Sequence, residues 1–262
     1  MKVQVFDIIF DDADVNLNAV YRPGQFIKFA IHLNLLEPTK CKAVYVRLFG
    51  DSSVHWTEQV QSGGDDSSET VHYSSQEKYI DETVYIYNNH HPAGEFIYPV
   101  SFQLPPTAPA SFESSIGNIR YYIQARMDRS WNKSNMAKKF FTVIRDFDLN
   151  FCRPEEIGPY NATGEFNVTC NACICFNCSS CYGKVLVRVE LPKKAFVPGE
   201  HVHVTGEISN FSKTALQSVK LEIYQHCIYM TPSKSRVDCR VVSELQLDRI
   251  QRGHSMQLNH VL

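Results

Sequence analysis

The 262-residue sequence predicts an all-β fold made of two β-sandwiches in tandem. Segments in which apolar and polar residues alternate recur about every eight to twelve residues between turn residues, as is typical of sandwiches. No segment combines a sustained helical period with capping residues. The chain is too long for one ordinary sandwich, and its 44% of hydrophobic residues can supply two cores.

One turn motif occurs twice and supports the tandem arrangement. Residues 21–24 read Tyr-Arg-Pro-Gly and residues 196–199 read Phe-Val-Pro-Gly, and an alternating strand follows each. Proline presets φ at the first central position of a type II turn, and glycine accepts the positive φ needed at the second. We interpret the repeat as the start of two related β units; coincidence between two ordinary turns is the alternative.

Residues 1–150 are predicted to form the first sandwich. A loop of Ser, Gly and acidic residues is expected at 61–70, and a turn at 88–94. The run 105–109 interrupts regular pairing because its prolines lack an amide donor. Between these breaks, strands are predicted at 3–10, 25–33, 41–50, 53–58, 79–87, 95–104, 118–127 and 138–147.

Residues 151–183 are predicted to be a Cys-rich connector with a polar turn at 161–164, and residues 184–262 to form a second, partial sandwich. This unit is shorter than the first, and its last strand ends in mid-alternation. We therefore expect an unpaired strand edge and a lower stability than in the first unit. Its strands are predicted at 185–191, 201–209, 216–229, 236–247 and 255–262.

The connector carries the densest chemical signal of the chain, five cysteines at Cys170, Cys173, Cys175, Cys178 and Cys181. Two Cys-X-X-Cys pairs could supply four thiolates to zinc. Structural zinc sites usually set such pairs about a dozen or more residues apart, whereas a single residue separates them here. S-acylation of this apolar cluster is a second possibility, and reduced thiols without a ligand are a third. We expect no bound zinc and no cofactor.

Composition excludes several classes of partner and compartment. The formal net charge is −2, and no basic stripe of the kind that binds nucleic acid is present. No apolar run approaches the roughly 20 residues that span a bilayer. The N-terminal residues alternate and reach Asp7 too early for a signal peptide. We therefore expect a cytoplasmic protein with reduced thiols.

The sequence contains no recognisable catalytic motif. Neither a Gly-X-Ser-X-Gly elbow nor a phosphate-binding glycine loop is present. His90-His91 and His201-X-His203 could ligate a metal, but no carboxylate accompanies either pair in a recognised arrangement. Exposed histidines in turns are the commoner explanation, so we do not expect an enzyme.

Three stretches closely resemble the alpha-arrestins, the arrestin-domain-containing proteins. They are residues 94–106 (Gly-Glu-Phe-Ile-Tyr-Pro-Val-Ser-Phe-Gln-Leu-Pro-Pro), 110–113 (Ala-Ser-Phe-Glu) and 120–131 (Arg-Tyr-Tyr-Ile-Gln-Ala-Arg-Met-Asp-Arg-Ser-Trp). The patch at 54–58, the two turns and the Cys-rich connector also fit, so the resemblance covers nearly the whole chain.

The resemblance implies two tandem arrestin-like, immunoglobulin-type β-sandwiches and a non-enzymatic cytoplasmic adaptor. Such adaptors bind the cytoplasmic tails of membrane-protein cargo and link them to sorting or ubiquitin-ligase machinery during endocytosis. Peripheral association with the plasma membrane or endosomes follows from that role. The resemblance assigns no cargo-binding residue here. A soluble protein-interaction scaffold without membrane cargo is the alternative.

Two departures limit what the resemblance implies. Alpha-arrestins usually carry Pro-Pro-X-Tyr motifs for WW domains, whereas the adjacent prolines of this sequence, Pro105-Pro106, precede Thr107-Ala108. The sequence is therefore expected to lack that arm or to be a shortened product. Receptor-binding arrestins use a buried arginine as a phosphate sensor, and the nearest residues here are Phe140 and Phe141. We do not expect phosphate-triggered activation.

Overall fold

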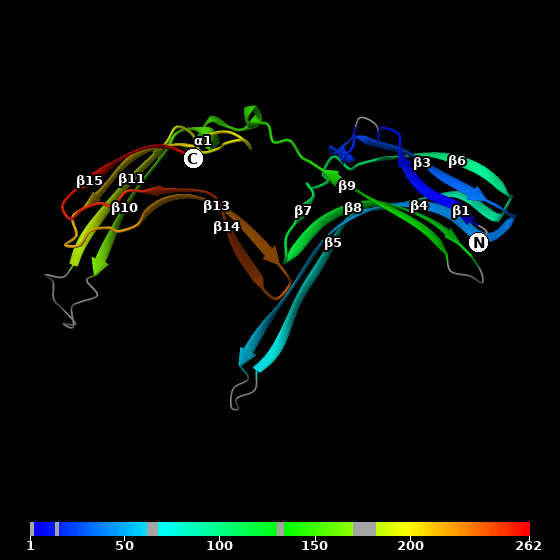
Figure 1. The fold of residues 1–262 in the computed structure, drawn as a ribbon, viewed down its shortest axis with the longest axis horizontal. Coiled ribbons are helices and arrows are strands. Elements are labelled where there is room, and N and C mark those ends of the chain that lie inside the picture. The colour runs from blue at the N-terminus through cyan, green and yellow to red at the C-terminus, as the bar shows by residue number, and fades with distance from the viewer. Residues whose placement is uncertain (1–2, 14–15, 62–67, 130–133, 170–181) are drawn as a thin grey trace. The chain divides into compact units, whose positions relative to one another are not determined.

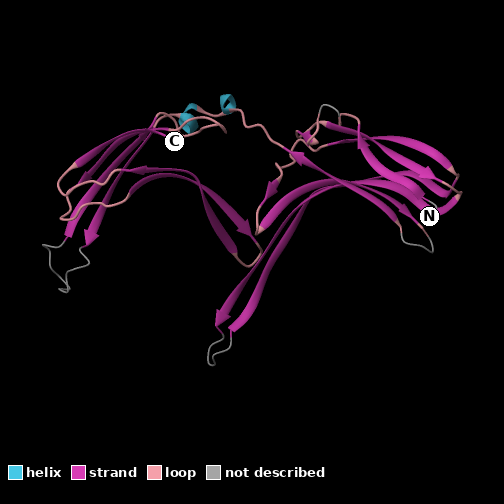
Figure 2. Ribbon diagram, in the orientation of Figure 1, coloured by secondary structure: helices cyan, strands magenta, loops and turns pink. Residues whose placement is uncertain are grey.

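The computed structural model describes residues 3–13, 16–61, 68–129, 134–169 and 182–262, and strands dominate it (Figure 1, Figure 2). The chain divides into two compact units. The first comprises Met1–Asp146 and Ile228–Arg236, and the second comprises Phe147–Cys227 and Val237–Leu262. In the described part of the chain, no helix is long and apolar enough to cross a bilayer. The all-β prediction is confirmed.

The first unit contains two sheets. A three-stranded sheet has the order β1-β3-β6, and a six-stranded sheet has the order β2-β9-β8-β4-β5 with β7 paired to β8 (Figure 1). The strands are β1 (Val3–Phe10), β2 (Val20–Tyr21), β3 (Phe26–Leu35), β4 (Thr39–Gln61), β5 (Ser68–His91), β6 (Gly94–Gln103), β7 (Phe112–Glu113), β8 (Gly117–Asp128) and β9 (Asn135–Val143).

The core of this unit lies between the inner faces of the two sheets. Every second side chain of β3 from Ile27 to Leu35 is buried, and so is every second one of β8 from Tyr121 to Met127. This period of two is the one that a strand with one covered face requires. Aromatic side chains fill much of the space, with the ring of Tyr121 next to that of Phe141.

Strands β4 and β5 are longer than the sequence predicted. The segments predicted at 41–50 and 53–58 form one strand, because Asp51 and Ser52 pair with both β5 and β8 instead of forming a turn. A register shift at Gly50/Asp51 absorbs the irregularity there. β5 begins at Ser68 and runs to His91, so Gln61 and residues 68–70 of the predicted loop lie in strands, and the predicted turn at 88–94 begins later.

The two Pro-Gly turns have the same local structure. Gly24 has φ +83° and Gly199 has φ +87°, the positive values expected at the second central position. In each turn the fourth residue donates its amide to the first residue's carbonyl: Gln25 to Arg22 at 3.1 Å and Glu200 to Val197 at 3.0 Å. The side chain of that fourth residue also accepts from the first residue's amide. The two turns therefore share the same backbone geometry and the same side-chain hydrogen bond.

The second unit contains a four-stranded sheet of order β10-β11-β12-β15 and most of a two-stranded sheet of β13 and β14, whose hairpin end, Ile228–Arg236, belongs to the first unit (Figure 1). Its core includes Val185, Ile208, Leu247 and Leu258. The elements are a 3₁₀ turn (Leu149–Phe151), α1 (Pro154–Ile157), β10 (Tyr160–Thr169), β11 (Tyr182–Leu191), β12 (His203–Asn210), β13 (Val219–Met230), β14 (Ser235–Leu247) and β15 (Ser255–Val261).

The prediction of a turn at 161–164 is wrong. These residues belong to β10, which pairs antiparallel with β11 from Tyr160 opposite Leu191 to Thr169 opposite Tyr182. The Asn-Ala-Thr-Gly sequence favours a turn locally, but pairing along ten residues outweighs that preference. The four-stranded sheet therefore recruits a strand from the stretch that the sequence predicted to be a connector.

A buried amide joins two loops of the second unit. The Asn210 side chain is fully buried and donates to the carbonyls of Thr214, Ile250 and Gln251 at 2.8–3.2 Å. Its oxygen accepts from the amide and the hydroxyl of Ser212. A buried amide is tolerated when its donors and acceptors are satisfied, as they are here.

We predict that Gly50→Ala destabilises the first unit. A Cβ at Gly50 would collide with the ring of Tyr121 and lie 2.8 Å from Cγ2 of Ile80, and both side chains are held in the core. Overpacking of this kind costs about 1–3 kcal/mol of unfolding free energy. Urea denaturation measures the loss. Val60→Ala, at an exposed position of the same strand, is the control, and equal midpoints for the two variants would contradict the prediction.

A pocket where strand β8 changes its neighbour

The candidate site of the first unit lies where β8 exchanges one neighbouring strand for another. β9 pairs with β8 from Met127 to Tyr121, and β7 pairs with it at Ile119 and Asn118. After Phe141, β9 leaves β8 and pairs in parallel with β2, Thr142 lying opposite Val20. Two strands therefore diverge beside Arg120, and the sheet is open between them.

Hydrogen bonds hold this opening in shape. Ser111 donates its amide to the carbonyl of Val143 at 2.8 Å, and its Oγ accepts from the amide of Val143 at 2.9 Å. The hydroxyl of Tyr121 donates to the carbonyl of Pro109 at 2.7 Å. Burial of this hydroxyl raises the pKa of Tyr121 well above its ordinary value, so it remains a donor at neutral pH.

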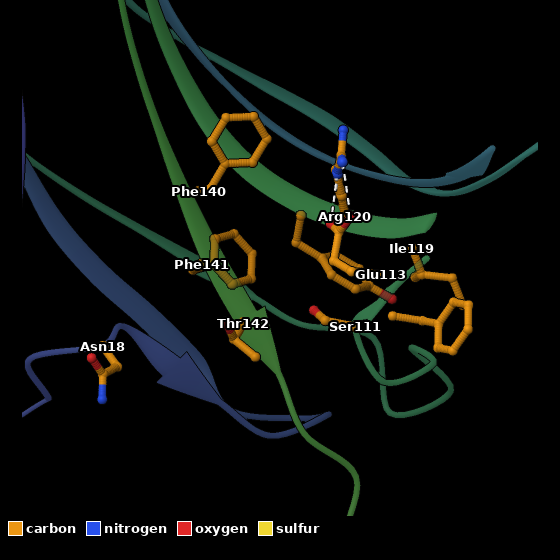
Figure 3. Close-up of a pocket in the computed structure, with 10 residues that line it drawn as sticks. Asn18, Ser111, Glu113, Ile119, Arg120, Phe140, Phe141 and Thr142 are labelled. Carbon is orange, nitrogen blue, oxygen red and sulfur yellow. Dashed lines mark hydrogen bonds and ion pairs between the residues drawn. The ribbon is translucent and has the colours of Figure 1, made fainter. Parts of the chain in front are cut away.

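The opening forms a pocket of about 560 Å³, which we call the junction pocket (Figure 3). Phe141 and Ile119 give it apolar walls, while Thr142 and Asn18 supply polar groups at one end. A concave apolar surface with a few polar groups is the usual form of a binding site. The pocket is lined by Asn18, Ser111, Phe112, Glu113, Ile119, Arg120, Tyr121, Phe140, Phe141 and Thr142.

Arg120 and Glu113 form a two-pronged ion pair at the pocket (Figure 3). Nε and Nη2 of Arg120 lie 2.6 and 2.8 Å from the two carboxylate oxygens of Glu113. The hydrogen bonds from Arg120 lower the pKa of Glu113. Both side chains are about half exposed, so solvent weakens the pair and another carboxylate could compete for the guanidinium.

Aromatic rings continue from the pocket over the outer face of the six-stranded sheet. Phe140, Tyr122 and Phe49 form a row across β9, β8 and β4, with ring centroids 5.6 and 5.2 Å apart. The ammonium of Lys138 lies 3.5 Å from the Tyr122 centroid and 4.6 Å from that of Phe140. Burial lowers the pKa of Lys138. We call Phe49, Tyr122, Phe140 and Lys138 the aromatic row.

A second charged group borders the aromatic row. Arg47 lies 4.5 Å from the Phe49 centroid and donates two hydrogen bonds to Asp81, at 2.5 and 2.8 Å. Lys78 donates to the same carboxylate at 2.7 Å. Hydrogen bonds from Arg47 and then from Lys78 hold the pKa of Asp81 well below its ordinary value. Two cations thus share one carboxylate at the edge of the row.

These features can bind a ligand through cations, aromatic rings and an apolar hollow. Among the residues that line the junction pocket, Glu113 is engaged by Arg120, and Ser111 is engaged by the backbone of Val143. No histidine or cysteine lines it to act as a base or nucleophile. Cations recognise carboxylates, and aromatic rings recognise cations and other aromatic rings.

The residues that the sequence singled out lie elsewhere or outside the described chain. Cys170, Cys173, Cys175, Cys178 and Cys181 lie outside the described residues, so the zinc prediction remains a prediction. His91 is fully buried, with its two ring nitrogens 2.7 Å from the Tyr98 hydroxyl and 3.0 Å from the Pro92 carbonyl. His201 and His203 are exposed. Within the described ranges, no three potential metal ligands come together.

Sequence reasoning did not find the junction pocket, although one signal for it was present. Phe140 and Phe141 are adjacent in a strand, so one of the two rings has to face away from the core. Phe141 is buried, with its ring 5.7 Å from that of Tyr21, whereas Phe140 is 56% exposed.

Comparison with protein families identifies the class to which this fold belongs. The family model described as Arrestin (or S-antigen), N-terminal domain matches residues 6–150, which is more than half of the chain. The model described as Arrestin (or S-antigen), C-terminal domain matches residues 181–262. The chain therefore belongs to the arrestin family, and its sandwiches are arrestin domains.

Individual relatives place the chain among the arrestin-domain-containing proteins. It is 29% identical to arrestin domain-containing protein 5 of Bos taurus, over 84% of this chain and 66% of that protein. It is 26% identical to arrestin domain-containing protein 17 of Caenorhabditis elegans, over 98% and 61%. Identity to the thioredoxin-interacting protein of Sus scrofa is 23%, over 96% and 61%. The chain spans less than two thirds of the length of these relatives.

We predict that Asp81→Asn destabilises the protein at neutral pH but not in acid. Because folding lowers the pKa of Asp81 below its ordinary 3.8, its contribution is present above that value and is lost as the pH falls towards the folded pKa. The pair is partly exposed, so the loss near pH 7 should be about 1 kcal/mol. Denaturant unfolding from pH 7 down to acid tests this, and about 1 M salt should shrink the difference. A loss independent of pH would contradict the prediction.

Proposed function

We propose that this arrestin-family protein is a non-enzymatic adaptor that binds the cytoplasmic tails of membrane proteins. In this role it links cargo to sorting or ubiquitin-ligase machinery during endocytosis and trafficking. The observation that carries the proposal is the junction pocket together with the aromatic row beside it. Family membership supports an adaptor-like role of this kind.

The chemistry of the surface supports tail binding. Lys138 lies over aromatic rings, and Arg120 can exchange Glu113 for a carboxylate of the ligand. The junction pocket can then receive one side chain of an extended segment. Such contacts need no folded partner, which suits tails that are disordered before they bind.

The proposed place of action is the cytoplasmic side of the plasma membrane or of endosomes, where such tails lie. The alternative is a scaffold that binds soluble proteins only. The two alternatives differ in the proteins that the chain would bind: an adaptor of this kind binds integral membrane proteins, whereas the scaffold does not.

We predict that Phe140→Ala combined with Lys138→Ala removes cargo binding. The change shortens the wall of the junction pocket and removes the cation of the aromatic row. Affinity purification of the full chain from detergent-solubilised membranes, with identification of the retained proteins, measures the effect. The wild type should retain integral membrane proteins, and the variant should retain at most about a tenth as much, as expected for loss of a central contact.

Ile97→Ala is the matched control for this experiment. Ile97 is 58% exposed on β6, in the other sheet of the same unit, so the variant loses a similar apolar side chain away from the site. It should retain cargo like the wild type. Retention of only soluble proteins by the wild type would support the scaffold, and equal losses in both variants would remove the junction pocket from the proposal.

We predict that this chain does not bind WW domains directly. Pro105 and Pro106 lie in a turn in which the amide of Ala108 donates to the Pro105 carbonyl at 3.0 Å, so they do not offer the extended polyproline II ligand. No Pro-Pro-X-Tyr motif occurs in the sequence. Titration of a panel of isolated WW domains tests the prediction, and binding at low micromolar concentration by any of them would refute it.

A further inference from the structure

The hairpin of β4 and β5 in the first unit extends past the strand beside it (Figure 1). β8 pairs with β4 only as far as Val54. From His55 to Gln61, β4 pairs with β5 alone among the described strands. We call residues 55–61 and 68–74 the β4–β5 arm. A two-stranded hairpin by itself is marginally stable in water, so contacts between side chains of the two strands determine how firmly the arm is held together.

One face of the β4–β5 arm is held by aromatic packing. Trp56 and Tyr73 lie opposite each other in the two strands, and their rings are stacked with centroids 5.3 Å apart. Trp56 is buried, and its indole nitrogen donates to the carboxylate of Glu58 at 3.2 Å. These contacts fix the register of the two strands, so they also fix the backbone positions of the residues on the other face of the arm.

The other face of the β4–β5 arm carries two histidines, His55 and His72. His55 lies opposite Ser74 and His72 lies opposite Thr57, so the two histidines are diagonal neighbours across the strands. Their ring centroids are 5.8 Å apart, and both side chains are exposed. Neither ring has a hydrogen-bond or ion-pair partner among the described residues. Both imidazoles are therefore available to a ligand.

The spacing of the two rings fits a shared metal ion. A metal–nitrogen bond to histidine is about 2.0–2.1 Å long and the ring centre lies about 1.2 Å beyond the nitrogen, so two imidazoles on one ion have their centres about 5–6.5 Å apart. The 5.8 Å between His55 and His72 lies within that range. Because pairing already fixes both backbones, only rotation about side-chain bonds is needed to aim the two nitrogens at one point.

The chemistry of this face indicates which kind of ion it would bind. Side chains alternate between the two faces of a strand, so the residues that flank the histidines on this face are Thr57, Gln59, Thr70 and Ser74. None of these four carries a positive charge that would repel a cation. Imidazole is a preferred ligand of zinc, copper and nickel, whereas calcium and magnesium prefer oxygen ligands. The pair therefore suits a divalent transition metal.

We propose that His55 and His72 chelate one divalent transition-metal ion, which links β4 to β5 on the polar face of the β4–β5 arm. The ion would hold this face together as the stacked rings of Trp56 and Tyr73 hold the other. Two imidazoles leave further coordination positions to water, so the ion exchanges with solvent, unlike an ion enclosed by four protein ligands. The proposal concerns the arm and does not depend on the junction pocket.

Quenching of Trp56 fluorescence by Ni²⁺ tests the proposal in the full chain. Trp56 follows His55 directly in β4, and the paramagnetic ion quenches an indole only at short range. The Trp131→Phe chain, which lacks the other tryptophan of the sequence, is the reference protein, so the signal comes from the β4–β5 arm. We expect saturable quenching. Zn²⁺, which does not quench, should compete with Ni²⁺ and restore the fluorescence.

Substitution of the two histidines in the reference protein tests chelation. His55→Asn and His72→Asn should each weaken Ni²⁺ binding at least about tenfold, because loss of even an outer-shell partner costs about 10–100-fold in metal affinity. The double variant should lose little more than either single variant, because one substitution already removes the chelate. His90→Asn, at an exposed position of the same strand, is the matched control and should bind Ni²⁺ like the reference protein.

Hydrogen exchange shows whether the ion links the two strands. Saturating Zn²⁺ should slow amide exchange in the β4–β5 arm of the wild type but not of His72→Asn, because an ion that binds only the paired strands stabilises them against opening. Absence of saturable quenching, an equal effect of His90→Asn, additive losses in the double variant, or amide exchange in the arm that Zn²⁺ leaves unchanged would overturn the proposal.

Discussion

The packing of Tyr121 against Gly50 is the constraint on which the first unit depends. The ring of Tyr121 occupies the space that a side chain at residue 50 would need, and it lies beside Phe141 in the core. Its hydroxyl then reaches out of the core to the carbonyl of Pro109. One side chain thereby joins the packed interior to the loop that precedes β7.

That loop determines the shape of the surface. Two residues after Pro109, Ser111 binds both the amide and the carbonyl of Val143, which fixes β9 after it has left β8. Because β9 then pairs with β2, the space beside Arg120 cannot close. The junction pocket is thus a consequence of core packing, because Tyr121, which is buried, and Ser111, which is partly buried, are both hydrogen-bonded to the backbone around it.

The sequence predicted those features that depend on local chemistry. The twin turns follow from Pro-Gly, and the burial of β3 and β8 follows from alternation. Predictions were wrong where pairing outweighed local preference, as at Asp51 inside β4 and at 161–164 inside β10. The junction pocket could not be predicted, because it depends on which strands lie beside β8. The sequence of one chain does not show which of its strands pair with one another. The adjacent pair Phe140-Phe141 indicated only that one ring would be exposed.

The surface of the first unit limits the way in which a ligand can be held there. The backbone groups of the central strands are used in pairing, so a ligand meets side chains such as Lys138 and Phe140. Contacts through side chains fix the ligand's charged and aromatic groups but not its backbone, so ligands of different backbone conformation can share them. Each unit has its own core, and every residue that lines the junction pocket belongs to the first unit. The shape of the junction pocket therefore depends on the packing of the first unit.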